Sequence, residues 1–457
     1  MKKLLNEKII NLANSMPKPL YIVGGASRDF LIDKSLSKDI DLCSPLNLEV
    51  VIEIAKSQGL DIIATYSRTN TAVLFDGQRK YEFTCFRKDI YGEGGKHSPL
   101  YTEYTEDIKE DALRRDFKCN AVYYDIKNSQ FCDVLGGIED IKNRVLSTVK
   151  NPAEVFSHDG LRLMRLARFS GELGFKVDEK TLIGARENAD KIKDISKERI
   201  FDELKKMLVA DKRHSFSDKQ GHYNCLKVLD EIGVLQIILP QLCLGKGLEQ
   251  RKDFHNYDVF NHSLRCVLYA PERVRLVALF HDIGKPFCYL KDGNFYQHPK
   301  EGEMIAKKVL CDLKASKKEI DEVGFLTKHH MIDMDLNMSE KKVRRFILNN
   351  YRYIPMLFEI KQADFSACKD QAKLCPTVQK WKKILGQMKD EKIPFSQGEL
   401  DITSKELMEI GYRGKQIGEI RKHLFSLVCV GEEKNSNARL KEIAKKNFDK
   451  NLKSNIW

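Results

Sequence analysis

The hydrophobic pattern of this chain changes near Pro152, and that change constrains the fold more than any other feature. Before Pro152, short apolar runs alternate with polar residues at the two-residue period of strands, with helical stretches between them. After Pro152, almost every segment has helical spacing up to the C-terminus. The sequence therefore predicts an α+β fold, with a mixed β-sheet in an N-terminal head and an all-helical remainder.

The head has a readable order of elements. An apolar strand is expected over Pro19–Val23, ending at Gly24-Gly25, and a helix over Arg28–Ile32. Asp39–Leu42 alternates polar and apolar residues, the pattern of a half-buried strand. A helix at 46–56 and strands at 61–66, 71–75 and 80–86 follow. Residues 87–107 are polar and glycine-rich and predict a long loop, and such loops are often functional.

Length and composition narrow the class of protein. The 457 residues predict two to four domains. The net charge of +12 permits a polyanionic partner, and a lysine-rich solvated surface explains it equally well. No apolar run approaches the roughly 20 residues of a membrane span. Polar residues interrupt the N-terminal 12 residues, and the 12 cysteines include no CxxC pair. We therefore expect a cytoplasmic protein with reduced thiols and no membrane partner.

The glycine pair and two aspartates form the most informative cluster of the head. A strand that ends in Gly24-Gly25 lets backbone N–H groups approach phosphate oxygens, and Arg28 can add a charged clamp. Asp39 and Asp41 share one face of a strand, where two carboxylates repel unless a cation lies between them. Hard oxygen ligands select Mg²⁺ or Mn²⁺. An exposed acidic strand without metal is the alternative. Together these residues indicate phosphoryl transfer, in which metal activates a 3′-hydroxyl and neutralises a nucleoside triphosphate.

A second cluster repeats charged residues every three positions along a predicted helix. Asp159 and Arg162 lie side by side there, and Arg165 and Arg168 rotate progressively away. An aspartate acceptor beside an arginine fork can hydrogen-bond the edges of C and A. The alternative is an amphipathic helix with an arginine face.

These segments, with others in the same order, resemble the class II nucleotidyltransferases, the family of tRNA CCA-adding enzymes and bacterial poly(A) polymerases. The resemblance covers roughly residues 17–240 and rests on the segments YIVGGASRDF…KDIDL, 111–121, 135–141, 159–169 and 198–204.

The resemblance implies roles for individual residues. It makes Asp39 and Asp41 the catalytic metal ligands and Asp116 a structural residue. It implies nucleotide contacts from Gly24, Gly25, Arg28, Arg115, Asp159, Arg162, Arg165 and Arg168, the last four on the side that reads the base. His158 stands where the family usually has a glutamate that orients the arginine fork, and a histidine cannot do so in the same way. The predicted loop at 87–107 sits where the family has a flexible loop, which favours complete CCA addition over CC-only addition.

Histidines gather in the second half of the chain. The order H…HD…H…HH…D over about a hundred residues resembles the HD phosphohydrolase superfamily. The resemblance implies His262, His281, Asp282 and Asp364 as ligands of a divalent transition metal or Mg²⁺. It also implies His298 with His329 (His330 being the alternative) as ligands of a second metal. A degenerate HD fold kept as an RNA-binding body is the other interpretation.

The combined prediction is a multidomain enzyme. Its expected parts are the head (1–147), a helical neck (148–215), an HD domain (216–380) and a basic helical tail (381–457). The expected function is addition of C and A to the 3′ end of tRNA from CTP and ATP, with Mg²⁺ and no nucleic-acid template. Tail lysines (441, 445, 446, 450 and 453) are expected to hold the tRNA backbone.

Three alternatives remain open. The first is a poly(A) polymerase or a CC-only or A-only enzyme. The second is an HD-type phosphohydrolase whose head only binds nucleotide or RNA. The third is a non-catalytic RNA-binding module, against which the intact acidic pair argues.

Overall fold

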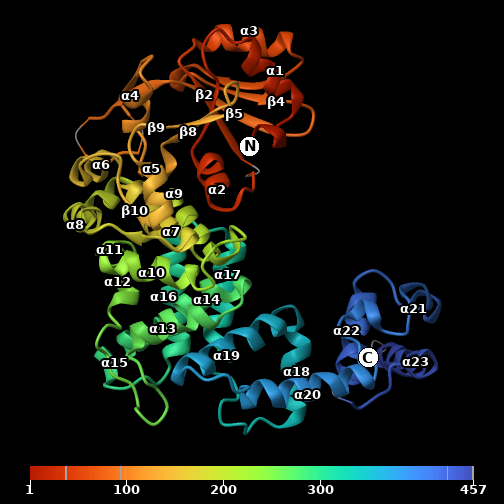
Figure 1. Cartoon of the computed structure of the whole chain (residues 1–457). Helices are drawn as coiled ribbons and strands as arrows, with labels where there is room; N and C mark the ends of the chain where they lie inside the picture. Colours follow the sequence, from red (N-terminus) through yellow and green to blue (C-terminus); the bar gives the residue numbers. More distant parts are fainter. Residues whose placement is uncertain (37–38, 93, 98, 430, 455–457) are drawn as a thin grey trace. The chain divides into compact units, whose positions relative to one another are not determined.

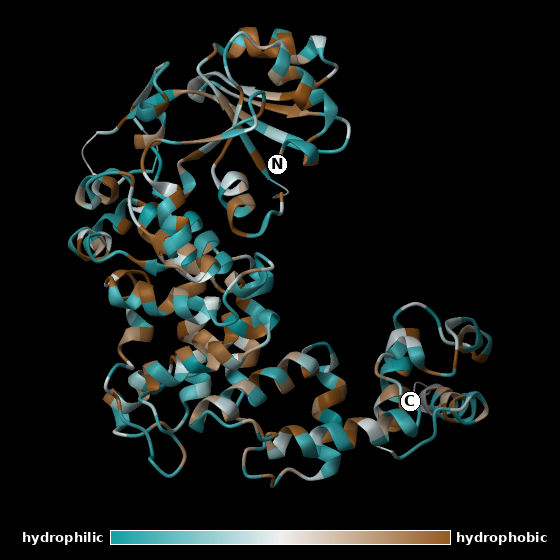
Figure 2. Ribbon diagram, viewed as in Figure 1, coloured by the Kyte–Doolittle hydropathy of each residue, from teal (hydrophilic) through white to brown (hydrophobic). Residues whose placement is uncertain are grey.

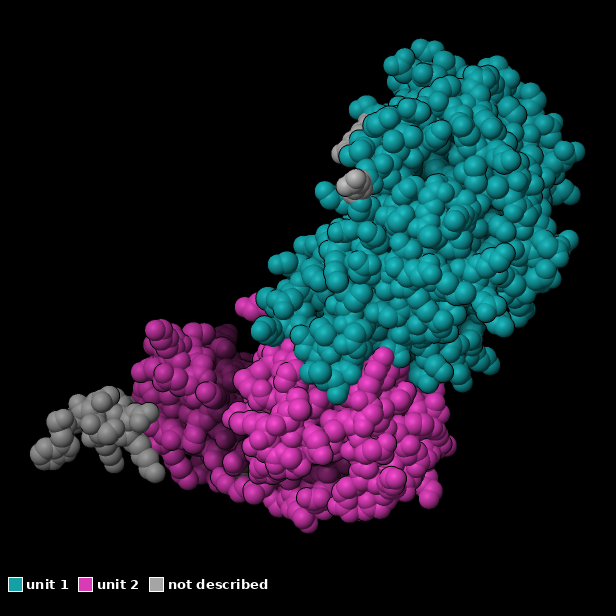
Figure 3. All heavy atoms as spheres, turned by 90° about the vertical axis from the view of Figure 1, so that its left-hand side faces the viewer, with its two compact units in different colours: residues 1–244, 308–316 teal, residues 245–307, 317–457 magenta. Residues whose placement is uncertain are grey.

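The computed structural model describes residues 1–36, 39–92, 94–97, 99–429 and 431–454, without the side chains of Arg68 and of residues 450–454 (Figure 1). The chain forms two compact units, coloured in Figure 3. The first comprises Met1–Leu244 with Lys308–Ser316, and the second comprises Gly245–Lys307 with the chain from Lys317 onward. The first unit contains the predicted head (1–147) and neck (148–215), and it continues to Leu244, past the predicted boundary at 215/216.

A seven-stranded sheet forms the centre of the head, in the order β3-β4-β5-β2-β1-β8-β9. Its β2–β5 pair is parallel, and its other neighbouring pairs are antiparallel. The strands are β1 (Tyr21–Val23), β2 (Ile40–Ser44), β3 (Asp61–Tyr66), β4 (Thr71–Phe75), β5 (Lys80–Cys85), β8 (Val122–Asp125) and β9 (Gln130–Asp133). The five strands predicted from the sequence are present, and β8 and β9 are two that it did not predict.

The two faces of this sheet pack against different parts of the head. Helices α1 (Glu7–Ser15) and α3 (Leu48–Ser57) pack on one face, and their apolar colouring is visible in Figure 2. Strand alternation directs Ile22, Leu42 and Phe83 into that core. Asp41 and Glu82 therefore lie on the opposite face. There a smaller core includes residues of α4 (Ile108–Leu113) and α6 (Pro152–His158).

The segment predicted as a long loop contains regular structure. Strands β6 (Arg87–Ile90) and β7 (Tyr101–Tyr104) pair antiparallel, so the predicted loop over 87–107 is corrected to a hairpin with a connection at 91–100. The side chains of both strands are mostly polar, which hides the period of two. The backbone ladder, with Arg87 opposite Tyr104 and Ile90 opposite Tyr101, holds the hairpin together.

Helices make up the neck around α7 (Leu161–Leu173). They are α8 (Glu179–Glu187) and α9 (Lys197–Met207), followed by α10 (Gly221–Glu231), α11 (Val234–Ile238) and α12 (Pro240–Cys243), whereas α5 (Gly137–Asn143) belongs to the head. Gly171 lets α10 approach α7, because a Cβ there would lie 2.4 Å from the Gly221 carbonyl oxygen. One exception to the all-helical prediction is β11 (Lys176–Val177), which pairs in parallel with β10 (Val145–Leu146).

The rest of the chain is helical. Its α-helices are α13 (Val259–Tyr269), α14 (Arg275–Phe280), α15 (Lys285–Asp292), α16 (His298–Asp312), α17 (Lys317–His329), α18 (Glu340–Asn349), α19 (Ile354–Lys369), α20 (Pro376–Asp390), α21 (Ser404–Ile410), α22 (Lys415–Cys429) and α23 (Asn437–Ser454). The last three share their own apolar core, which includes Leu407, Leu424 and Leu440. Among the described residues, no helix combines the length and apolarity needed to cross a membrane.

Candidate active site and candidate metal centre

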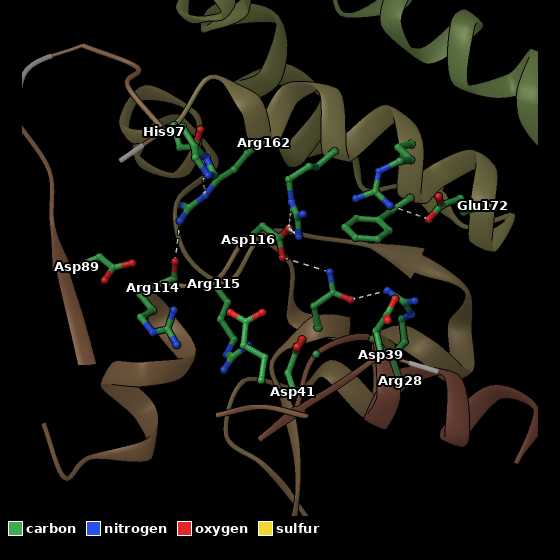
Figure 4. A pocket seen from close by; sticks show the side chains of 18 of the residues that line it. Arg28, Asp39, Asp41, Asp89, His97, Arg114, Arg115, Asp116, Arg162 and Glu172 are labelled. Carbon is green, nitrogen blue, oxygen red and sulfur yellow. Dashed lines mark hydrogen bonds and ion pairs between the residues drawn. The ribbon is translucent and has the colours of Figure 1, made fainter. Parts of the chain in front are cut away.

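A cleft of about 660 Å³ lies between the head sheet and the neck helix α7 (Figure 4). Among the carboxylates that line its head side, three lie close together at β2 and β5. Asp41 on β2 is in register with Val23 on β1 and with Glu82 on β5, and Asp39 directly precedes β2. The Asp39 side chain is 88% exposed. This group of oxygen donors is the ligand type that Mg²⁺ prefers.

Gly24 makes room for the Asp41 carboxylate. Its φ is +77°, and a Cβ built there would stand 3.0 Å from Asp41 Oδ2. A side chain at this position would be strained and would push the carboxylate away. The glycine is therefore required at the start of α2 (Gly25–Asp33) by both backbone conformation and space.

The electrostatics at Asp41 suit a bound cation. Desolvation by the surrounding protein raises the pKa of Asp41, and the nearby Glu82 and Asp39 charges raise it further. Arg115 acts in the opposite direction. A divalent ion at these carboxylates would remove the repulsion that raises the pKa, so the residues present fit the metal that the sequence predicts.

Arg28 is buried in the wall of the cleft, and each of its three guanidinium nitrogens donates a hydrogen bond. Its Nε and Nη2 donate to Asp29 Oδ1 at 2.8 and 2.6 Å, and its Nη1 donates to Asn120 Oδ1 at 2.7 Å. Asn120 in turn donates to Asp116 Oδ1 at 3.2 Å. This chain of bonds fixes the arginine predicted to contact phosphate.

Asp116 joins the head to the neck. Its Oδ2 accepts from Arg165 Nε at 2.7 Å, and its Oδ1 accepts from the Phe117 N–H at 2.8 Å. Burial alone would raise the pKa of Asp116, but Arg165, Arg162 and Asn120 lower it to about 2. The carboxylate is thus ionised at neutral pH, and its contacts suit the structural role predicted for it.

Asp111 anchors the two arginines that precede Asp116. This fully buried carboxylate accepts from Arg114 Nε at 2.7 Å, Arg115 Nη2 at 3.1 Å and the Tyr123 hydroxyl at 2.7 Å. These donors overcome the effect of burial and hold the pKa of Asp111 well below its usual range. Arg115 is thereby positioned beside Asp41.

The predicted base-reading pair occupies the neck side of the cleft. Asp159 Oδ1 accepts from the Leu161 N–H at 2.9 Å, and its Oδ2 lies 2.9 Å from His97 Nδ1 and 3.7 Å from Arg162 Nε. Burial raises the pKa of Asp159 to about 6, although Arg162 and Arg165 oppose the shift. Figure 4 shows His97 and Arg162 together at this edge of the cleft.

The Arg162 guanidinium is held by the backbone and the hairpin connection. Its Nη2 donates to the Arg114 carbonyl oxygen at 2.6 Å, and the group lies 5.7 Å from the Tyr91 ring centre. His158 does not bind Arg162. It stacks on Tyr91 with ring centres 5.1 Å apart. Tyr91 and a carbonyl therefore support the arginine where the sequence comparison expects a glutamate.

Arg168 is a predicted nucleotide-binding residue that is held by two carboxylates of the neck. It lines the cleft, but its Nε donates to Glu203 at 2.6 Å and its Nη1 to Glu172 at 2.9 Å. The bond from the Arg168 guanidinium to Glu203 links α7 to α9, so we assign Arg168 a structural role.

Several lining residues were not predicted. They are Asp89, Tyr91, His97, Asn120, Arg199, Arg213 and His214. Asn120 lies inside a segment already singled out. Arg199, on α9, also lies inside such a segment (198–204). The others come from the hairpin or from the neck loop after α9, and no local pattern links them to the glycine and aspartate motif.

The histidines of the second unit meet in one buried cluster. His262 Nε2 lies 3.0 Å from Asp364 Oδ1, 3.2 Å from His281 Nε2 and 3.5 Å from Asp282 Oδ2. On the other side, Asp282 Oδ1 lies 3.3 Å from His298 Nε2 and 3.5 Å from His330 Nε2. Asp282 thus stands between two groups of ligand atoms.

The structure places His330 in this cluster and not the predicted His329, which is a correction. His329 donates from Nδ1 to the Phe325 carbonyl oxygen at 2.8 Å, and its ring packs on Phe325 and Phe346. Helix α17 ends at His329, so the next residue leaves the helix and points in a different direction.

The donor set fits a divalent metal. His281, His298 and His330 each donate from Nδ1 to a backbone carbonyl at 2.7–2.8 Å. In the neutral ring, the lone pair of Nε2 is then the atom that can bind a metal ion. Burial lowers the pKa of His330 to about 4, so its ring is neutral at neutral pH. Asp282 Oδ1 is buried and lacks a hydrogen-bond partner among the described residues. A cation is what such an oxygen requires.

Comparison with known proteins identifies domains in both halves of the chain. Three family models match, for a poly(A) polymerase head domain (residues 20–147), a probable RNA- and SrmB-binding site of polymerase A (174–244) and an HD domain (259–354). The CCA-adding enzyme of Lactobacillus helveticus is 37% identical over 234 residues, which covers 50% of this chain and 56% of the relative. The match thus spans about half the length of that relative. The CC-adding tRNA nucleotidyltransferase of Thermus thermophilus is 29% identical over 76% of each chain.

Solved structures share the fold. The CCA-adding enzyme of Bacillus stearothermophilus in complex with CTP aligns with a TM-score of 0.65 over 98% of each chain, at 22% identity. The chain belongs to the class II nucleotidyltransferase family and carries an HD domain. Membership of this class implies dependence on a divalent metal ion.

Proposed function

We propose that this protein adds C and A to the 3′ end of tRNA from CTP and ATP, with Mg²⁺ and without a nucleic-acid template. The observation that carries the proposal is the single cleft that joins Asp41 and Glu82 on one side to Asp159 and Arg162 on the other. The Lactobacillus helveticus relative, a CCA-adding enzyme, supports the same activity. Such an activity would be exercised on tRNA in the cytoplasm.

Asp39 and Asp41 would hold the magnesium ions, with Glu82 beside them. The metal supplies charge neutralisation of the triphosphate and activation of the attacking 3′-hydroxyl. Arg115, fixed beside Asp41 by Asp111, contributes a positive charge at the same place. The backbone at Gly24 leaves space for phosphate oxygens as well as for Asp41.

Base selection follows from hydrogen-bond chemistry at Asp159 and Arg162. Cytosine and adenine each present an amino group beside a ring nitrogen acceptor on the pairing edge. Uracil and guanine present a carbonyl oxygen beside an N–H. An aspartate acceptor next to an arginine donor complements the pairing edges of cytosine and adenine. The same arrangement places like groups against the edges of uracil and guanine. This explains how one protein site selects C and A without a template.

The test uses three tRNA transcripts, ending before CCA, after C and after CC. Each is incubated with Mg²⁺ and CTP, ATP or both, and products are resolved at single-nucleotide length. The proposal predicts that all three are extended to CCA and no further. Extension only up to CC or only from CC would show a CC-only or A-only enzyme. Long A ladders would show a poly(A) polymerase, and absence of extension would remove the transferase proposal.

The buried cluster around Asp282 favours a second candidate function, metal-dependent phosphohydrolysis. Two groups of ligand atoms share this aspartate, and Lys285 donates to Asp282 Oδ2 at 2.6 Å. Such a centre binds a divalent transition metal or Mg²⁺ and activates water toward a phosphate ester. Replacement of Asp39 and Asp41 by alanine should abolish nucleotide transfer and leave hydrolysis intact, whereas Asp282→Ala should do the reverse.

The basic tail would contact the tRNA backbone. The structure restricts which lysines are available for this contact. Lys441 pairs with Glu406 at 2.8 Å and Lys446 with Glu442 at 2.7 Å. Lys445 is exposed. The predicted side chains of Lys450 and Lys453 lie outside the described residues.

A further inference from the structure

Three consecutive neck residues each contact an aspartate of the head. They follow a short 3₁₀ helix at 210–212, in the loop before α10. The pairs are Arg213 with Asp39 at 3.8 Å, His214 with Asp29 at 3.5 Å and Ser215 with Asp33 at 2.7 Å. The loop is thereby held against the part of the head that carries the predicted metal and phosphate ligands.

Two of these contacts fix the loop in place. The Ser215 hydroxyl donates to Asp33 Oδ2, and the His214 ring stacks on Phe216 with centres 4.8 Å apart. His214 Nδ1 approaches the Asp29 oxygen that Arg28 leaves free. The loop position is therefore determined by ordinary hydrogen bonding and packing, independently of Arg213.

Arg213 differs from most arginines of the cleft. Six of them contact a carboxylate at 3.1 Å or less, namely Arg28, Arg87, Arg114, Arg115, Arg165 and Arg168. The Arg213 side chain is 58% exposed, and its ion pair with Asp39 is long, at 3.8 Å. It thus reaches the site where the metal is expected while keeping donors available to a ligand.

We infer that Arg213 is a further nucleotide-binding residue, which clamps the phosphates of the bound triphosphate from the neck side. The inference rests on the proposed function. Asp39 attracts Arg213 and the predicted metal ion alike, so the guanidinium already lies where a metal-bound triphosphate would be. A planar fork of N–H donors suits phosphate oxygens better than a single carboxylate oxygen at 3.8 Å.

The experiment compares Arg213→Ala with Lys212→Ala. Lys212 is the adjacent exposed residue, does not line the cleft, and loses the same charge when replaced. Calorimetry in Mg²⁺ measures the binding of inorganic pyrophosphate, CTP and ATP to the full-length protein. Arg213→Ala should weaken all three by about tenfold, the usual effect of a lost charged hydrogen bond. Lys212→Ala should weaken them by less than about twofold, because salt screens distant charges.

Further variants keep the inference falsifiable. Arg213→Lys should give an intermediate loss, because the charge remains and the fork does not. Ser215→Ala, which frees the loop without changing charge, should weaken pyrophosphate binding by a smaller factor. Cytidine binding should not change in any variant. Equal effects of Arg213→Ala and Lys212→Ala would overturn the inference. So would loss of RNA primer binding in Arg213→Ala while pyrophosphate binding is retained.

The inference and the proposed function fail separately. Wild-type protein that binds pyrophosphate but extends no tRNA contradicts the proposed function, and the Arg213→Ala comparison then still decides the clamp. Wild-type protein that extends tRNA while Arg213→Ala binds pyrophosphate normally contradicts only the clamp.

Discussion

The two predicted metal sites of this molecule are built in opposite ways. In the cleft of the first unit, Asp39 and Asp41 face solvent, and oxygen is the ligand atom. In the second unit, His262, His281 and Asp282 are buried and nitrogen predominates. An exposed oxygen site suits an ion that arrives and leaves with its substrate. A buried nitrogen site suits an ion that stays.

The difference also shows in how the ligands are held. His281, His298 and His330 are each fixed by a bond from Nδ1 to the backbone carbonyl three residues earlier, so these ligands of the second site are oriented before an ion binds. The cleft instead fixes its arginines through Asp29, Asp111 and Asp116, and leaves the acidic residues open. In the second unit, the metal-binding side chains are held in place. In the cleft, the arginines proposed to bind the nucleotide are held in place.

The largest effect is expected from Asp41→Asn, which tests whether the cleft carboxylates hold the metal ion. The amide keeps the shape but removes a charge from the predicted magnesium site, so nucleotide transfer should fall on the order of a thousandfold. The melting temperature should hardly change, because the side chain is exposed. Asp61→Asn, on an exposed position of β3, is the matched control and should keep full transfer. Full activity in Asp41→Asn would mean that the metal binds elsewhere.

A paired replacement tests the second site. His330→Ala removes a clustered nitrogen, so affinity for the divalent ion should fall by at least the roughly 10- to 100-fold that loss of an outer partner costs. His329→Ala should keep the metal, because His329 packs on Phe325 and Phe346. Metal content after dialysis, measured by elemental analysis, distinguishes the two. The opposite pattern would restore the original prediction of His329.

Asp159 provides a smaller, pH-dependent effect. Its pKa is raised to about 6, so acid should protonate the base acceptor and lower kcat/KM for CTP and ATP by about tenfold per unit below that value. In Asp159→Asn, kcat/KM should no longer fall as the pH is lowered through this range. His97, Arg162, Arg165 and Asp116 are the charged or titratable groups that face or influence this carboxylate.

The same pKa shift affects stability, with a definite sign. The folded state binds this proton more tightly than the unfolded chain does, so the free energy of unfolding should fall as pH rises from about 4 to 6. The contribution is roughly 3 kcal/mol at most. Urea unfolding of wild type and Asp159→Asn across this range measures it. Parallel pH profiles for the two proteins would contradict the assignment.

The smallest effect is expected in the tail. Lys445→Ala should weaken tRNA binding by less than about 1 kcal/mol and reduce the salt slope by about one. Lys441→Ala should do less, because Glu406 already occupies that lysine. Filter binding at several salt concentrations is sufficient. Equal slopes for Lys445→Ala and wild type would exclude Lys445 from the RNA contact.

The sequence predicted those parts of the fold that have a strong period. Strands β2, β3 and β5 alternate between more and less exposed residues, and β1 and β4 are short apolar runs, so all five were found to within two residues. Strand β8 is buried on both faces and shows no alternation. Strands β6, β7 and β9 are mostly polar, and the backbone ladder that holds them leaves no mark in the side chains.

The candidate site was predictable where its residues share an element. Asp39 and Asp41 are two apart at a strand, and Asp159 and Arg162 are three apart at the start of a helix. Glu82 joins them only through the parallel pairing of β2 with β5. His97 and Arg213 reach the cleft from distant segments. The choice between His329 and His330 depends on where α17 ends, which a sequence locates only to within a residue or two.

The pairing of charges in the cleft has a kinetic consequence. Among the described lining residues, nine arginines stand against eight carboxylates, so the cleft is almost neutral when seen from a distance. Long-range attraction of a nucleotide is therefore weak, and its association rate should depend little on ionic strength. The arginines act only at close range, once a phosphate can compete with their carboxylates. The lysine-rich remainder of the chain gives the molecule its net positive charge, and this charge would attract the proposed tRNA substrate over longer distances.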